Sequence, residues 1–131
     1  MAIVSIGSDI CQVSRIADVL ERRGEAFLTR IFTAGEQAYC EARPRTRATH
    51  YAGRFAVKEA VMKALGTGWR SGVRWVDIET RREPGQAPQV HLHGRSREHA
   101  AERGIDRWHL TITHDAGIAA ARKAIALDAN Y

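Results

Sequence analysis

The chain has 131 residues, of which 44% are hydrophobic, and a formal net charge of +5. This length predicts a single domain spanning residues 1–131, large enough to bury a hydrophobic core. No apolar run approaches the roughly 20 residues that cross a bilayer, which argues against a membrane protein. The N-terminus lacks the basic and long apolar segments of a secretory signal, so we expect a cytoplasmic protein.

The positive charge comes mainly from arginine, which supplies 17 of the 20 basic residues. Arginine binds phosphate or carboxylate through two parallel hydrogen bonds. The excess therefore indicates either a solvated basic surface or a polyanionic partner: nucleic acid, a nucleotide-like molecule or an acidic protein. No zinc-finger spacing, aromatic RNA-binding motif or clear helix-turn-helix pattern supports nucleic acid. The two cysteines, Cys11 and Cys40, are expected to be free thiols.

The first part of the chain predicts a strand followed by a helix. Residues 2–7 are rich in β-branched side chains and end at a glycine, which is typical of a short strand. The isolated carboxylate Asp9 follows this strand. Ser14 can cap a helix over 14–23, and Gly24 can end it.

Two more helices are predicted before residue 66. Thr33 and Glu36 have the spacing of a capping box, which predicts a short helix toward residue 40. Pro44 ends that helix. The principal helix is predicted over 49–65.

The second half of the chain predicts strands and one helix. Apolar and polar residues alternate in the first three strand segments, as in half-buried strands. The final segment is rich in alanine, which favours helix, but the tight turn before it favours a strand paired with the preceding one, and we expect a strand. The predicted elements are strands at 75–80, 89–93, 108–114 and 118–127 and a helix at 96–103. The expected class is α+β, with a largely antiparallel sheet packed around the 49–65 helix.

The 49–65 helix carries the residues with the clearest chemical potential. Glu59 and Lys63 share one face of the helix. The cations Arg54 and Lys58 share a neighbouring face. One carboxylate among three cations can hold a divalent metal while the cations hold phosphate. The alternative is an ordinary surface ion pair between Glu59 and Lys63, with solvated cations beside it.

The glycine-rich sequence Gly66-Thr67-Gly68 follows this helix directly. Its glycines would let backbone N–H groups approach a phosphate closely, although Gly66 is also in the usual position of a helix C-cap. Asp9 becomes a metal ligand if the fold brings it to Glu59. Two carboxylates, completed by waters and phosphate oxygens, suit Mg²⁺.

Three of the histidines on predicted strands are candidate ligands. His91 and His93 share one strand face, but no other Cys or His has zinc-site spacing with them, so a structural pair is the expectation. His114 lies at a strand end before a turn and is better placed to contact a phosphate.

Together these segments resemble the holo-acyl-carrier-protein synthase family, the small 4'-phosphopantetheinyl transferases. The matching stretches, in family order, lie at residues 6–10, 30–33 with Glu36, 53–60, 63–68 and 110–114. The most specific is Gly-Arg-Phe-Ala-Val-Lys-Glu-Ala at 53–60. The resemblance implies the 4'-phosphopantetheinyl transferase fold and a role in fatty acid biosynthesis. In the implied reaction, coenzyme A donates 4'-phosphopantetheine to a serine of an apo acyl carrier protein, releasing adenosine 3',5'-bisphosphate.

The resemblance also implies roles for individual residues. Asp9 and Glu59 match the acids that bind Mg²⁺, and Lys63 matches a lysine at the reacting phosphate. Whether Lys63 or Glu59, acting through a water, deprotonates the serine is left open. The residues that match coenzyme-A contacts are Arg54, Lys58, Gly66, Thr67, Gly68, Pro88 and His114.

The implied assembly is a homotrimer with active sites between subunits. The implied docking face for the acidic carrier protein is the first helix, through Arg15, Val19 and Arg22. The physiological acceptor and the role of Glu36 stay open. One alternative is the same chemistry on a polyketide-synthase carrier domain; another is a non-enzymatic basic module binding acidic protein or RNA.

Overall fold

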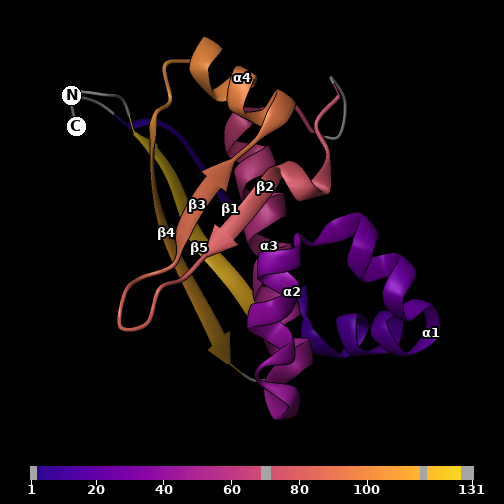
Figure 1. Cartoon of the computed structure of the whole chain (residues 1–131). Helices are drawn as coiled ribbons and strands as arrows, with labels where there is room; N and C mark the ends of the chain where they lie inside the picture. The colour runs from indigo at the N-terminus through magenta and orange to yellow at the C-terminus, as the bar shows by residue number, and fades with distance from the viewer. Residues whose placement is uncertain (1–2, 69–71, 116–117, 128–131) are drawn as a thin grey trace.

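Figure 1 shows a computed structural model, which describes residues 3–68, 72–115 and 118–127. No described helix is both long and apolar enough to cross a membrane. The elements in chain order are β1 (Ile3–Gln12), α1 (Val13–Ile31), α2 (Ala34–Glu41), α3 (Arg47–Leu65), β2 (Ile78–Arg81), β3 (Gln89–Leu92), α4 (Gly94–Glu102), β4 (Arg107–Asp115) and β5 (Ile118–Leu127), with 3₁₀ turns at Pro44–Thr46 and Trp75–Asp77.

The described strands form two antiparallel sheets. The larger sheet has the order β1-β5-β4, and β2 pairs with β3 in a separate hairpin. The prediction of a strand at 118–127 is confirmed, because β5 is the central strand and pairs with both neighbours. Its alanines favour helix only weakly, and two ladders of hydrogen bonds outweigh that preference.

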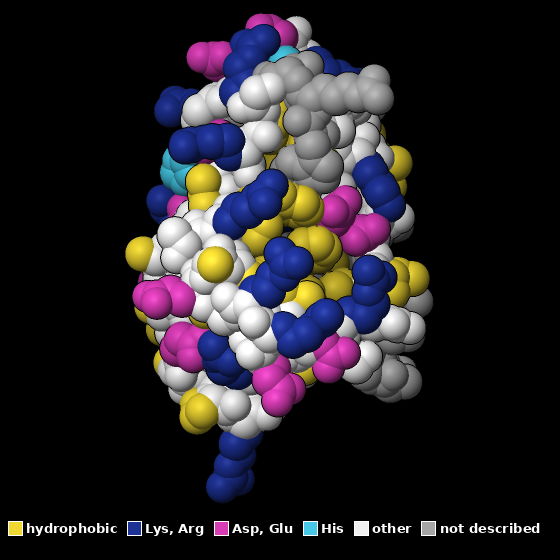
Figure 2. Space-filling model, turned by 90° about the vertical axis from the view of Figure 1, so that its right-hand side faces the viewer, with side chains coloured by type: hydrophobic (Ala, Val, Ile, Leu, Met, Phe, Trp, Pro, Cys, Tyr) yellow, Lys and Arg dark blue, Asp and Glu magenta, His cyan; other side chains and the backbone are white. Residues whose placement is uncertain are grey.

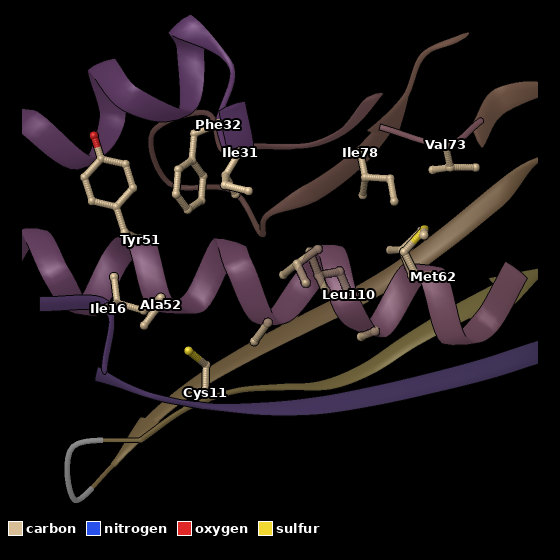
Figure 3. Packing of buried hydrophobic residues seen from close by; sticks show 14 of the residues in the cluster. Cys11, Ile16, Ile31, Phe32, Tyr51, Ala52, Met62, Val73, Ile78 and Leu110 are labelled. Atoms are coloured by element: carbon tan, nitrogen blue, oxygen red, sulfur yellow. The ribbon is translucent and has the colours of Figure 1, made fainter. Parts of the chain in front are cut away.

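Helix α3 lies between the larger sheet and a second layer made of α1, α2 and the β2–β3 hairpin (Figure 1). Figure 3 shows the resulting core, with Phe32, Ile31 and Ile78 on one side of α3 and Cys11 on the other. These four side chains are all buried. The predicted α+β class, with the sheet packed on a long central helix, is confirmed.

The faces between α3 and β1 are built from very small residues. Ala56, Ala60 and Ala64 are fully buried on the helix. On the strand, a Cβ added to Gly7 would lie 1.9 Å from the carbonyl oxygen of Ala60. The two backbones can approach this closely only because neither side chain reaches beyond a methyl group.

The start of the chain differs from the predicted elements. Strand β1 continues through Asp9 to Gln12 because it stays paired with β5 over this length. Helix α1 then begins directly after Gln12, without a side-chain cap, so Ser14 is not the N-cap. Gly24, with φ 47°, kinks the helix rather than ending it. The chain resumes helical geometry because Leu28 and Ile31 are buried in the core.

Of the N-terminal caps predicted for α2 and α4, only the cap of α2 is present. The capping box is confirmed: Thr33 Oγ1 accepts from the Glu36 N–H at 3.1 Å, and Glu36 Oε1 accepts from the Thr33 N–H at 3.0 Å. Ser96 does not cap α4, which begins at Gly94. Its hydroxyl is buried and lies within hydrogen-bond distance of the carbonyl oxygens of His93 and Asp77, so it joins α4 to the turn before β2.

Candidate active site

Asp9, Glu59 and Lys63 lie together where β1 crosses α3. Lys63 Nζ donates to Asp9 Oδ1 at 3.0 Å and to the Ser8 carbonyl at 3.1 Å. Burial raises the pKa of Glu59, the charge of Asp9 raises it further, and Lys63 opposes both effects. The structure therefore brings the three predicted catalytic residues into one electrostatic cluster.

The Asp9 and Glu59 carboxylates suit Mg²⁺ better than they suit a metal whose ligands all come from the protein. Among the described residues, no group of three or more His, Cys, Asp and Glu side chains could hold a metal. Mg²⁺ typically takes one or two carboxylates and completes its shell with waters and substrate phosphates. A divalent cation between Asp9 and Glu59 would also relieve the repulsion that raises the pKa of Glu59.

A hollow of about 370 Å³ adjoins this cluster at the end of α3. Its lining includes Glu59, Lys63, Gly66 and Gly68. Gly66 is the helix C-cap, with φ 75° and its N–H donated to carbonyls of the last turn. Within the described ranges, the buried Thr67 hydroxyl oxygen has no hydrogen-bond partner. An unpaired buried hydroxyl beside a hollow is a candidate ligand contact.

Other predicted contacts meet in a second cavity of about 340 Å³. Arg54, Pro88 and His114 all line it. Arg54 is only 3% exposed, and its guanidinium carbon lies 3.8 Å from the centroid of the Tyr39 ring. Burial lowers the pKa of His114, and the charge of Arg54 lowers it further.

The two cavities are separate in one chain. They share no lining residue. At about 100° per residue, Arg54 and Lys63 point to roughly opposite sides of α3. The structure therefore gathers the predicted site residues into two groups rather than one.

Lys58, a predicted coenzyme-A contact, lines neither of these two cavities. The side chain is fully buried and pairs with Glu36 Oε1 at 2.8 Å. Its ammonium also donates to the carbonyl oxygens of Trp75 and Ile78, which uses all three of its protons. Burial lowers the pKa of Lys58, and Glu36 acts against that shift.

Glu36, whose role the sequence left open, is the other half of this internal connection. One carboxylate oxygen accepts from Lys58 and the other accepts from the Thr80 N–H at 3.0 Å. The pair thus ties α2, α3 and β2 together. We assign Glu36 and Lys58 to the scaffold that holds α3 in place.

The predicted docking residues lie on the N-terminal part of α1. Arg15 and Arg22 are exposed and Val19 is partly buried. Figure 2 shows Lys and Arg side chains gathered around a hydrophobic area on the side of the molecule that carries α1. A hollow of about 690 Å³ between the second part of α1 and the turn before β2 is lined by Arg30, Arg74, Thr29, Val73, Trp75 and Val76.

The remaining histidine and cysteine predictions agree with the structure. His93 Nε2 lies 2.9 Å from Glu79 Oε1, and His91 Nδ1 lies 3.3 Å from an Arg81 nitrogen, so both serve the β2–β3 hairpin. Cys11 and Cys40 are buried free thiols. Burial raises the pKa of Cys11 to about 11, which removes it from thiolate chemistry near neutral pH.

The sequence did not indicate three of the aromatic or basic residues that line the second cavity: Tyr39, His50 and Arg82. One signal was available, because His50 lies four residues before Arg54 and so shares its helix face. Tyr39 and Arg82 come from other elements, and no pattern in the sequence connects them to Arg54.

The chain is similar over nearly its whole length to known proteins. A model of the 4'-phosphopantetheinyl transferase superfamily matches residues 5–120. The holo-acyl-carrier-protein synthase of Anaeromyxobacter sp. (strain K) is 48% identical over 122 residues, covering 91% of this chain and 92% of that protein.

Solved structures give the same result. The holo-acyl-carrier-protein synthase of Neisseria meningitidis superposes with a TM-score of 0.85 at 28% identity, covering 96% of this chain and all of that one. That of Helicobacter pylori, solved in complex with coenzyme A, gives 0.78 at 32% identity, covering 92% and 99%. The sequence match, the fold and the clustered Asp9, Glu59 and Lys63 agree: this chain belongs to the 4'-phosphopantetheinyl transferase superfamily.

Proposed function

We propose that this protein, acting as a single domain, transfers 4'-phosphopantetheine from coenzyme A to a serine of an apo acyl carrier protein and releases adenosine 3',5'-bisphosphate. The family match and the curated relatives support the transfer itself. The observation that carries the proposal for this chain is the convergence of Asp9, Glu59 and Lys63 beside the hollow at the end of α3. That convergence weighs against the alternative of a non-enzymatic basic module, which would have gained support if Asp9 and Glu59 lay far apart.

In this proposal Asp9 and Glu59 would hold Mg²⁺. The ion would supply positive charge that stabilises the negative charge developing during phosphoryl transfer. Lys63, whose side chain is 56% exposed, is free to turn from Asp9 to the reacting phosphate. The hollow lined by Gly66 and Gly68, with the unpaired Thr67 hydroxyl beside it, receives the phosphate end of the substrate.

The geometry favours Glu59 over Lys63 as the base. Lys63 Nζ is paired with Asp9 Oδ1 at 3.0 Å and donates to the Ser8 carbonyl at 3.1 Å, so in this arrangement it acts as a donor and not as an acceptor. Glu59 lines the hollow beside Lys63 and can accept a proton through a carboxylate oxygen. We therefore propose that Glu59 takes the serine proton through a water.

We propose that the adenosine end of coenzyme A binds in the second cavity, and that a neighbouring copy of the chain contributes this cavity. The two groups of residues face opposite sides of α3, so one molecule of coenzyme A would contact both only if a second subunit supplied Arg54, Pro88 and His114. Three large apolar side chains along β1 are exposed in a single chain and would be covered by such a copy: Ile3, Ile6 and Ile10. We propose a cytoplasmic homotrimer with its active sites between subunits.

The acidic carrier protein is proposed to dock on α1. Arg15 and Arg22 are exposed, and Arg30 and Arg74 line the hollow beside that helix. Exposed cations attract an acidic partner and set the rate of encounter. Figure 2 shows a hydrophobic area among Lys and Arg side chains on the side of the molecule that carries α1, and the docked partner would cover this area.

Mass spectrometry of the acceptor tests the activity. An apo acyl carrier protein given coenzyme A, Mg²⁺ and this enzyme should gain roughly 340 Da, the mass of phosphopantetheine. A variant carrier without the acceptor serine is the control, and a polyketide-synthase carrier domain run in parallel tests the alternative acceptor. No mass gain on either carrier at full enzyme loading would refute the proposal. Light scattering on the purified chain tests the trimer independently.

A further inference from the structure

The cavity around Arg54 is cationic and has no acidic lining residue among those described. Its polar lining side chains are Tyr39, His50, Arg54, Arg82, Thr111 and His114. They come from α2, α3, β4 and the segment between β2 and β3. Such a cavity favours an anion of high charge density.

Arg54 carries the strongest sign of a missing partner. Tyr39 lies between two guanidinium groups, with the carbon of Arg43 3.7 Å and that of Arg54 3.8 Å from its ring centroid. Arg43 also donates to the Tyr39 carbonyl oxygen at 2.8 Å. In the described part of the chain, the buried Nε of Arg54 has no hydrogen-bond partner. A buried cation with an unused donor is costly unless an anion completes its contacts.

Two histidine rings form another side of the same cavity. The centroid of the His50 ring lies 5.5 Å from the centroid of the Tyr39 ring and 6.0 Å from that of the His114 ring, and both pairs are edge to face. Gly53 makes room for this arrangement, because a Cβ there would lie 2.9 Å from His114 Cε1. The helix therefore carries a glycine, at a cost in helix propensity, where the His114 ring packs against it.

Among the groups that shift the pKa of either ring in the described part of the chain, there is no carboxylate. Burial lowers the pKa of His50 below the ordinary 6.5, as do Arg54, His114, Arg43 and Arg82. Burial and Arg54 lower the pKa of His114. Both shifts favour the neutral imidazole in the free protein, and a dianion bound against the two rings would oppose them.

We propose that His50 is a further binding residue of this cavity, and that the His50–His114 pair takes up a proton when the cavity binds a doubly charged phosphate monoester. Arg54 supplies the fixed charge and its unused Nε proton, and the histidines supply the charge that appears on binding. The inference rests on the proposed function, in which the monoester is the 3'-phosphate of coenzyme A. This proton uptake makes the cavity selective for coenzyme A over 3'-dephospho-coenzyme A, which lacks the 3'-phosphate.

Calorimetry on the full chain tests the proton uptake. Adenosine 3',5'-bisphosphate is titrated from about pH 8 to about pH 6.5 in two buffers of different ionisation enthalpy. The control ligand is the methyl ester of adenosine 5'-monophosphate, a monophosphate whose only phosphate is a singly charged diester. In this range the monoester phosphates of the bisphosphate are mostly dianionic, since their second pKa is about 6. We expect the bisphosphate to bind about 3- to 10-fold more tightly per pH unit of acidification, with net proton uptake. The monophosphate should show little of either.

Matched histidine variants locate the proton. His50→Phe keeps an aromatic ring against Tyr39 and removes the titrating group, and it should abolish at least half of the proton uptake. His109→Phe changes an exposed histidine of β4 that does not line the cavity and should leave the uptake unchanged. Circular dichroism checks folding, and His50→Gln replaces the Phe variant if that variant unfolds.

The outcomes separate this inference from the proposed function. Unchanged proton uptake in the His50 variant, equal pH dependence for both nucleotides, or no binding of the bisphosphate would overturn the inference. Phosphopantetheine transfer in the mass-shift assay, together with any of these results, would leave the proposed function intact. Proton-coupled binding without transfer would support the inference and refute the enzyme assignment.

Discussion

Gly7 of β1 and Ala60 of α3 are in such close contact that a methyl group at position 7 would lie 1.9 Å from the Ala60 carbonyl oxygen and 2.9 Å from the Ala64 nitrogen. Asp9 follows Gly7 by two residues, and Glu59 directly precedes Ala60. The contact that packs the strand on the helix therefore also places the two carboxylates side by side.

Gly7→Ala should destabilise the protein by at least about 1–3 kcal/mol, the usual cost of overpacking, because the clash is with backbone that cannot rotate away. Urea unfolding followed by circular dichroism measures this. Ser8→Ala, at an exposed neighbouring position, is the matched control and should change the free energy of unfolding by less than about 0.5 kcal/mol. Equal stabilities of the two variants would show that the strand does not need this approach.

Lys58→Met should lower the free energy of unfolding by about 3–5 kcal/mol, since it leaves the buried Glu36 carboxylate without its partner. Adding Glu36→Gln should recover part of that loss, because it removes the unpaired charge and keeps an oxygen for the Thr80 N–H. Denaturant titrations of the single and double variants give both values. A Lys58→Met protein of normal stability but weak coenzyme-A binding would instead support the predicted phosphate role of Lys58.

Asp9→Asn and Glu59→Gln should each lower kcat by at least about 100-fold at saturating coenzyme A, because each removes a charge that the proposed Mg²⁺ site needs. The measurement is the rate of carrier-protein modification across a Mg²⁺ titration, with circular dichroism as the folding control. Near-normal turnover in both variants would remove them from the metal site.

Glu59→Gln should also change the dependence of stability on pH. The pKa of Glu59 is raised above its ordinary 4.5 in the folded protein, so the folded state holds this proton more tightly than the unfolded state. The wild type therefore loses stability as pH rises from 4.5 through the folded pKa, and that loss persists at neutral pH. Thermal melts in metal-free buffer measure this. At pH 7 the Glu59→Gln variant should have a higher Tm than the wild type, and its stability should not show the fall with rising pH that Glu59 causes.

Lys63→Ala should reduce kcat by about 10- to 100-fold while changing the Kd for coenzyme A by less than about threefold. A group that acts mainly in the transition state affects turnover more than ground-state binding. Stopped-time kinetics and calorimetry on the same preparation separate the two quantities. If the variant bound coenzyme A weakly but turned over normally once saturated, Lys63 would be a binding residue only.

The double charge reversal Arg15→Glu and Arg22→Glu should raise the KM for the carrier protein by about tenfold and slow association, while coenzyme-A affinity changes little. The two arginines lie about two turns apart on one face of α1, so both can meet an acidic partner. Wild-type association should also slow with added salt, since exposed charges are screened within roughly 10 Å at 0.1 M. An unchanged KM would leave these arginines as solvated surface.

Several local features could be predicted from the sequence because neighbouring residues alone determine them. Thr33 and Glu36 form their capping box within one turn, and Gly66 ends α3 in the left-handed conformation that glycine adopts without strain. The alternating pattern likewise located β3 and β4 to within one residue or so. The family motif around Glu59 identified the chemistry for the same reason, since its residues are contiguous.

The tertiary structure decided which charged residues face a ligand. Lys58 and Glu59 are neighbours on α3, yet α2 and β2 cover the first while the second opens onto a hollow beside β1. Tyr39 and Arg82 join Arg54 only because α2 and the segment after β2 fold over the same side of that helix. A helix sequence fixes the angle at which each side chain leaves the axis. Only the packing of distant elements determines whether that direction ends in protein, in a cavity or in solvent.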